Sequence, residues 1–115
     1  MTINEHANPM TPAAEMFHAL ADPNRLAILK YLSASEARVA DLVDETGLAQ
    51  STVSAHVGCL RASGLIEGRA EGRQTFYRIG TPALVGLLAS AEDLLGEIGH
   101  PIHLCVEHGV AGSAR

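Results

Sequence analysis

The sequence predicts one mainly α-helical domain that carries a single β-hairpin. Apolar residues recur at helical spacing in several short segments between residues 13 and 98, and proline or glycine bounds these segments. Residues 65–79 differ, because two β-prone runs there flank a glycine-containing turn. The chain has 115 residues and is 47% hydrophobic, which suits one core rather than two. We expect the domain at 13–99, between a flexible N-terminal arm at 1–12 and a His- and Cys-containing C-terminal tail at 100–115.

Two helices are predicted before residue 33. The first spans 13–21, where three apolar side chains share one face. The pair Asp22-Pro23 then predicts a new helix start, since aspartate caps free backbone N–H groups and proline has no N–H to lose at the first helical position. This second helix is expected to reach Leu32 and to bury its leucine and isoleucine side chains.

The next two segments form a helix-turn-helix pattern. A short helix is expected at 39–46, ended by Gly47 in the left-handed conformation. A brief turn leads to a fourth helix at 51–62, which opens with small polar residues and stops at Gly64. Two helices joined by a tight turn, the second with a polar N-terminal end, are typical of DNA-binding modules.

The hairpin and the last helix complete the predicted fold. The strands at 65–69 and 73–79 form the hairpin, which in this position is the wing of a winged helix-turn-helix domain. The final helix begins at Thr81-Pro82 and runs to about Ile98 with an apolar stripe that is wide for so small a domain. A second subunit is the simplest cover for that stripe, although packing within the chain is the alternative. We expect a homodimer formed through the N- and C-terminal helices.

Charge is segregated along the chain despite a net charge of −5. Residues 50–80 contain four arginines and two acids, whereas the remainder contains four basic and eleven acidic residues. Because salt limits the reach of distant charges to about 8–10 Å, a basic face on an acidic body can still attract phosphate. Alone, this balance favours nucleic-acid binding only weakly.

The candidate DNA-binding residues lie on the fourth helix and the hairpin. Small polar side chains at the start of a recognition helix can contact phosphates and base edges in the major groove, and arginines can follow the backbone. The alternative for the serines and threonine is helix capping, which we expect of Ser51. The predicted DNA contacts are Gln50, Ser51, Thr52, Ser54, His56, Arg61, Arg69, Arg73 and Gln74.

At this point the sequence resembles a known family. The segments ALADPNRLAILKYL, STVSAHVGCLRASGLIEGR and EGRQTFYRI are similar to the ArsR/SmtB family of metal-sensing repressors, over roughly Phe17 to Ile98. The resemblance implies a dimeric winged helix-turn-helix protein whose apo form binds operator DNA and whose grip weakens when metal binds. The partners would be double-stranded operator DNA and a second copy of the chain.

Two of the metal sites that the family uses are absent. The arsenic-type site needs cysteines just before an Asp-Leu pair, but the residues that precede Asp41-Leu42 here, Arg38 and Ala40, are not thiols. The zinc-type site on the last helix needs acids and histidines at positions that hold Thr81, Ala83, Leu94 and Glu97 here. Of these only Glu97 can ligate a metal ion.

The remaining candidate resembles the cadmium- and lead-sensing, CmtR-like branch. Cys59 matches its first recognition-helix cysteine and Cys105 its tail cysteine, whereas Ser63 replaces the second. His103 or His108 would then supply a further ligand, and thiolate with imidazole suits cadmium, lead or zinc. The alternatives are a buried apolar role for Cys59, nickel or cobalt binding by the tail, and thiol redox sensing.

Other classes of protein are less consistent with the sequence. No apolar run is long enough for a membrane helix, the N-terminus does not look like a secretory signal, and two cysteines are too few for a disulfide framework. We therefore expect a cytoplasmic protein. No catalytic constellation or phosphate-binding glycine loop is evident, so an enzyme is not expected. A winged-helix module that binds protein rather than DNA is the rival function.

Overall fold

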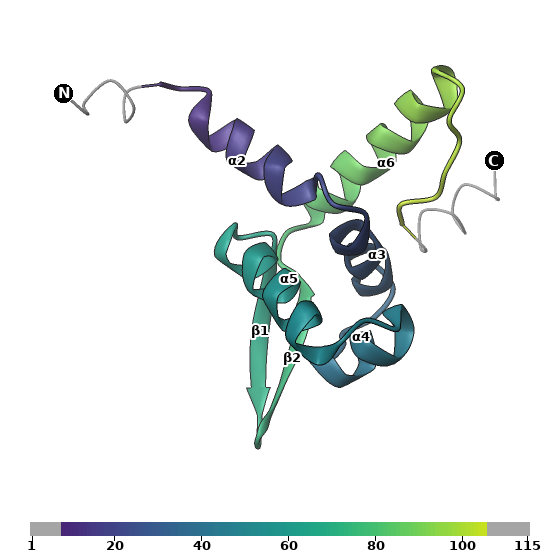
Figure 1. Cartoon of the computed structure of the whole chain (residues 1–115). Coiled ribbons are helices and arrows are strands. Elements are labelled where there is room, and N and C mark those ends of the chain that lie inside the picture. The colour runs from purple at the N-terminus through teal and green to yellow at the C-terminus, as the bar shows by residue number, and fades with distance from the viewer. Residues whose placement is uncertain (1–7, 106–115) are drawn as a thin grey trace.

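The computed structural model describes residues 8–105 (Figure 1). Within that range the chain forms five helices and one antiparallel hairpin, as the sequence predicted. Figure 1 shows α3, α4, α5 and the hairpin grouped together, while α2 and α6 diverge from this group. The elements are α2 (Thr11–Leu20), α3 (Pro23–Leu32), α4 (Val39–Thr46), α5 (Gln50–Ala62), β1 (Ile66–Glu71), β2 (Gln74–Ile79) and α6 (Pro82–Glu97).

The helix boundaries follow local capping chemistry. The Asp22 carboxylate accepts hydrogen bonds from the backbone N–H groups of Asn24 at 2.8 Å and Arg25 at 3.0 Å, and so caps α3. Gly47 ends α4 with a φ of 73°, which is the left-handed conformation that a C-terminal glycine supplies. α2 begins at Thr11, two residues earlier than expected, because Pro12 fits within a first helical turn.

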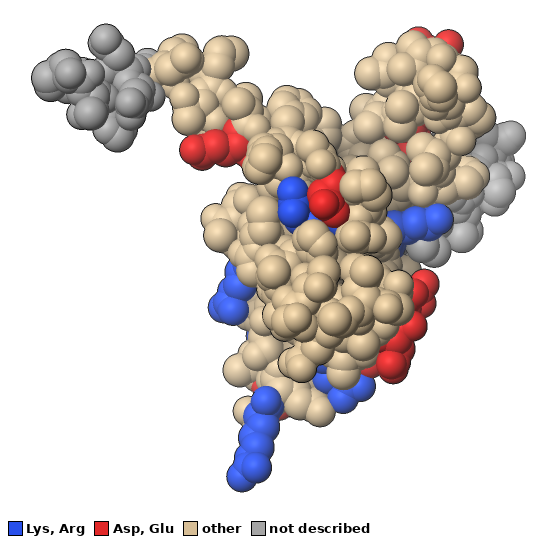
Figure 2. Space-filling view, in the orientation of Figure 1, with Lys and Arg blue, Asp and Glu red and all other residues tan. Residues whose placement is uncertain are grey.

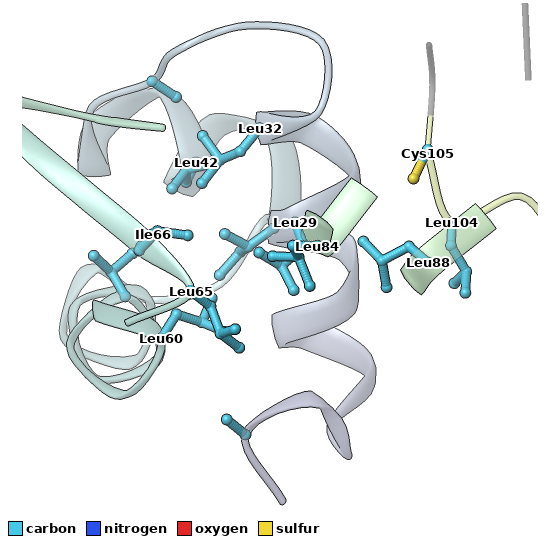
Figure 3. Packing of buried hydrophobic residues seen from close by; sticks show 14 of the residues in the cluster. Leu29, Leu32, Leu42, Leu60, Leu65, Ile66, Leu84, Leu88, Leu104 and Cys105 are labelled. Atoms are coloured by element: carbon cyan, nitrogen blue, oxygen red, sulfur yellow. The ribbon is translucent and has the colours of Figure 1, made fainter. Parts of the chain in front are cut away.

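The core is aliphatic and joins α3, α4, α5, the hairpin and the first half of α6 (Figure 3). Every buried side chain in it is Leu, Ile, Val, Ala or Cys. Close packing of such side chains holds each helix at one orientation. The buried residues are Ala19, Ile28, Leu29, Leu32, Ala37, Leu42, Val53, Val57, Leu60, Leu65, Ile66, Leu84, Leu88, Leu104 and Cys105.

The hairpin extends further toward its tip than the sequence indicated. β1 and β2 pair from Ile66 opposite Ile79 to Glu71 opposite Gln74. A two-residue turn joins them, in which Gly72 has a φ of 64°. At the base, Ala37 and Tyr77 exchange backbone hydrogen bonds of 3.0 and 2.7 Å. The wing is thereby fastened to the segment that precedes α4.

The apolar stripe of α6 is divided between two environments. Leu84 and Leu88 are buried within the chain itself, as the alternative interpretation proposed. Farther along the helix, Leu94 and Ile98 remain 58% and 60% exposed, and Phe17 of α2 is 55% exposed. The core therefore covers the first half of the stripe and leaves the second half, like Phe17 of α2, open to solvent.

The segment after α6 turns back onto the domain. Gly99 has a φ of 93°, and the chain beyond it brings Leu104 and Cys105 into buried positions beside Leu88 (Figure 3). The mostly buried Glu92 carboxylate of α6 accepts hydrogen bonds from the backbone N–H groups of Leu104 and, at 2.9 Å, Cys105. Burial of a carboxylate is costly unless it is hydrogen-bonded, so these contacts both satisfy Glu92 and fasten the tail.

Candidate functional site

The polar face of α5 is open to solvent. Val53, Val57 and Leu60 attach the helix to the core, and the other side of its first turns carries exposed polar residues. Four predicted DNA contacts share that exposed face: Gln50, Ser51, Thr52 and Ser54. The helix therefore presents donors and acceptors on a rigid support, which is what base and phosphate contacts require.

The N-terminus of α5 has no side-chain cap. The helix begins at Gln50, its capping position is Ala49, and no side chain accepts a hydrogen bond from its first turn. The expectation that Ser51 caps this helix is wrong, because the earlier start places Ser51 inside the first turn. The free N–H groups at a helix N-terminus favour anions such as phosphate.

Arg61 and Arg73 have no ion pair in the described part of the chain. The Arg61 guanidinium lies 6.0 Å from the centre of the Tyr77 ring, and its side chain is exposed. Arg73 is exposed in the turn at the tip of the hairpin, next to exposed Gln74. In Figure 2 a basic side chain projects from the hairpin end of the molecule. These side chains can approach phosphates without first breaking an internal ion pair.

Arg69 is engaged within the domain. Its guanidinium donates to Glu36 at 2.7 Å and to Glu71 at 2.8 Å, and it lies 5.2 Å from the centre of the Phe76 ring. The hydrogen bond to Glu36 is the largest cause that raises the pKa of Arg69, and the Arg69 side chain in turn lowers the pKa of Glu36. The charge count of the sequence could not reveal this pairing, nor that of Arg78 with Glu67 at 2.7 Å.

His56 lies apart from the exposed polar row. Its side chain is 15% exposed and contacts the start of α3, where the Nε2 atom lies 4.0 Å from an Asp22 oxygen. Its Nδ1 atom lies 3.4 Å from a guanidinium nitrogen of Arg25. Backbone N–H donation from Arg25 is the largest cause that lowers the pKa of Asp22. The sequence placed His56 among the DNA contacts, with a structural role as the alternative, and did not identify Asp22 and Arg25 at the start of α3 as its neighbours.

The two cysteines contact different elements. Cys59 is half-buried on α5, in a groove that α2 lines with Met16 and His18. Cys105 is fully buried, and its Sγ atom lies 3.9 Å from the backbone oxygen of Val85 in α6. A sulfur atom in such a position has no open coordination position, so metal binding at Cys105 would require the tail to move.

One of the two histidines predicted as further metal ligands lies within the described residues. His103 is exposed in the tail, where it lines a hollow together with Asp22 and Lys30. His108 lies outside the described residues. Among residues 8–105 of one protomer, no group of three or more His, Cys, Asp or Glu side chains is placed to hold a metal ion.

The described fold and its exposed α5 define a winged helix-turn-helix transcriptional regulator, and comparisons with known proteins agree. Residues 22–67 match the model of the bacterial regulatory protein family arsR. A Streptomyces lividans protein described as a probable mercury resistance operon repressor is 31% identical over 89% of this chain and 82% of its own length. The chain belongs to the arsR family of bacterial regulators. This assignment confirms a DNA-binding regulator rather than an enzyme.

Two solved structures illustrate the range of similar proteins. The homodimeric winged helix-turn-helix DNA-binding domain of a Mycobacterium bovis protein has a TM-score of 0.73 and 33% identity, covering 82% of this chain and 88% of that one. The cadmium metal sensor CMTR of Mycobacterium tuberculosis has a TM-score of 0.58 and 38% identity, covering 67% of this chain and 80% of that one.

Across the described residues, no helix is both long and apolar enough to cross a membrane.

Proposed function

We propose that this protein is a homodimeric repressor that binds operator DNA and releases it when a soft or borderline metal ion, cadmium, lead or zinc, binds. DNA would be contacted by the exposed row of α5, with Arg61, Arg73 and Gln74 on the backbone. The single observation that carries the proposal is that Cys59 lies on the same helix as that row. A ligand bound at Cys59 therefore acts directly on the DNA-binding element.

The dimer is supported by surface chemistry and by similarity. Exposed apolar side chains gather on α2 and on the second half of α6, including Phe17, Leu94 and Ile98. The similar M. bovis domain is homodimeric. A two-fold dimer through these helices would present two copies of α5 and the wing to successive half-sites of an operator.

The metal proposal rests on donor chemistry. Thiolate sulfur favours soft and borderline metal ions, and the similar proteins include a cadmium sensor and a probable mercury resistance repressor. We assign Cys59 and Cys105 as ligands, drawn from two protomers, with His103 or His108 contributing a further donor. The two thiols fit such an ion chemically, provided that the tail leaves its buried position.

Release of DNA needs only a modest difference in affinity. When bound, the metal would cross-link the recognition helix to the tail. An ion that binds the DNA-free conformation a few kcal/mol more tightly than the bound one shifts the equilibrium toward release. The chain itself carries one thiol, that of Cys59, on α5. It holds the other, that of Cys105, in a buried position through the hydrogen bonds of the tail backbone to Glu92.

The test is operator binding titrated with cadmium, lead, zinc, nickel and cobalt, for the wild-type protein and for Cys59→Ser and Cys105→Ser. We expect the wild type to leave DNA with a thiol-seeking ion and both variants to remain bound, while Ser63→Ala behaves as the wild type. Release of both cysteine variants by the same ion would overturn the site. Native mass spectrometry separates metal sensing, which adds the mass of the ion less that of the thiol protons it displaces, from redox sensing, which removes two hydrogens.

A further inference from the structure

Three segments of the chain meet around His56: the end of α2, the start of α3 and the middle of α5. The Arg25 guanidinium occupies the centre. It donates from Nε to the backbone oxygen of Ala19 at 2.6 Å and from Nη2 to that of His18 at 3.1 Å. Carbonyls in the last turn of a helix lack the N–H partner four residues on that interior carbonyls have, although the His18 oxygen also accepts from the Ala21 N–H at 3.1 Å. Arg25 therefore holds the end of α2 with two of its nitrogens and reaches α5 with the third.

The neighbours of the His56 ring indicate which of its two nitrogens accepts a hydrogen bond and which donates one. A guanidinium can only donate, so the 3.4 Å contact between Arg25 Nη1 and His56 Nδ1 requires a lone pair on Nδ1. The ring proton of the neutral imidazole then resides on Nε2, the atom that faces the Asp22 carboxylate at 4.0 Å. Asp22 is itself held in place, because it caps α3 through two backbone N–H groups.

We propose that His56 is a positioning residue, not a base-contacting one, and that the His56 cluster (Asp22, Arg25 and His56) sets the orientation of α5 relative to α2. The inference deepens the proposed function and rests on its operator binding, though not on its metal. At 15% exposure, the imidazole is directed toward α3, whereas Gln50, Ser51 and Ser54 are exposed.

The consequence of the cluster is a link between the two surfaces that the proposed dimer needs. α2 carries exposed Phe17 on the side where a second subunit would pack, and α5 carries the DNA contacts. In a two-fold dimer the distance between the two copies of α5 depends on their angle to α2. Loss of the cluster should therefore weaken operator binding without removing any contact to DNA.

The experiment uses the full chain and duplexes that the wild-type protein selects from a random library. The variants are His56→Leu, which removes the acceptor at Nδ1, Arg25→Gln, which removes the guanidinium, and the double variant. His56→Asn keeps an acceptor at the position of Nδ1. Affinity is measured over a range of salt concentrations, with the dimerisation constant and circular dichroism recorded for each protein.

We expect His56→Leu and Arg25→Gln each to weaken binding about tenfold on every selected duplex. The double variant should be no weaker than the weaker single variant, because both changes remove one interaction. His56→Asn should stay within about threefold of the wild type. The salt dependence should not change, whereas the control Arg61→Ala should reduce its slope by about one phosphate contact and add to His56→Leu.

Several results overturn the inference. One is a change in base preference at a single operator position in the His56 variants while the base preference of Arg25→Gln stays that of the wild type. Another is additive losses of affinity in the double variant.

If His56→Leu does not fold, the pair Arg25→Lys and His56→Asn replaces it. Arg25→Lys loses the forked geometry of the guanidinium, so an unaltered operator affinity for this variant contradicts the inference. A wild-type protein that selects no duplex defeats the repressor proposal as well. A wild type that selects a duplex, with all variants binding equally, defeats this inference alone.

Discussion

The recognition helix and the C-terminal tail are attached to the same domain in opposite ways. α5 buries Val53, Val57 and Leu60 along its length, so its exposed row is held by the core that folds the protein. The tail is held by two buried residues, Leu104 and Cys105, and by hydrogen bonds to Glu92. The exposed row of α5 is therefore fixed by the core, whereas the described part of the tail can leave its buried position at the cost of a few contacts. In the proposed repressor, the first would be the rigid DNA-binding element and the second the movable metal-binding element.

The largest effect is expected from removing a side chain that attaches α5 to the core. Leu60→Ala removes a fully buried side chain and should lower the free energy of unfolding by about 2–5 kcal/mol, and DNA binding should fall with it. Leu104→Ala in the tail should cost far less and leave DNA binding intact. Urea unfolding at one fixed protein concentration measures both, and equal losses would show that the tail belongs to the same cooperative unit.

The next effect concerns the hydrogen bonds by which Glu92 holds the tail and its Cys105 thiol in a buried position. Hydrogen bonds to a charged group contribute about 1.5–3 kcal/mol, so Glu92→Ala should raise the reaction rate of the Cys105 thiol about tenfold or more. The measurement is alkylation kinetics in a Cys59→Ser background, with operator binding recorded in parallel. Asp93→Ala, an exposed neighbour on α6, is the matched control. An unchanged rate would mean that Glu92 does not hold the tail.

The wing contains Arg73, which has no ion pair among the described residues, and Arg69, which is paired with two acids. Arg73→Ala should lower the slope of affinity against salt by about one phosphate contact, with no effect on unfolding. Arg69→Ala should change that slope less, because Glu36 and Glu71 already neutralise Arg69. Fluorescence anisotropy of a labelled operator over a salt series measures both slopes. The reverse order would show that Arg69 exchanges its acids for phosphate on binding.

The smallest expected effect concerns the start of α4. Hydrogen bonds from the Arg38 side chain, and then from its backbone N–H, lower the pKa of Asp41 from 3.8 to about 2. A depressed pKa in the folded state adds stability that is present above the unfolded value and is lost as pH falls toward 2. Asp41→Asn should therefore be less stable than the wild type at pH 6 and nearly equal to it near pH 2. Thermal unfolding across that range tests this, with exposed Asp44→Asn as control; a constant gap would contradict it.

Much of the fold was predictable because it depends on neighbours in sequence. Asp22-Pro23 caps a helix through bonds that span two and three residues, and Gly47 ends one through its own backbone angle. The exposed polar row of α5 follows from the same helical periodicity that buries Val53 and Val57. The helix-turn-helix pattern gave the candidate DNA contacts, whereas the metal switch and its ligands came only from the family resemblance.

The tertiary structure alone decided which candidate residues remain available. Arg69 meets Glu36 across 33 positions, Arg25 meets His56 across 31, and the tail reaches Glu92 across 13. Such contacts depend on how packed helices bring distant segments together, and no local pattern in the sequence records them. The amino-acid sequence by itself determined the helices, the wing and their polar and apolar faces. Packing determined that, among the candidate residues, Arg69 is paired, His56 faces inward and the Cys105 thiol is buried, because those outcomes arise only when separate elements share a core.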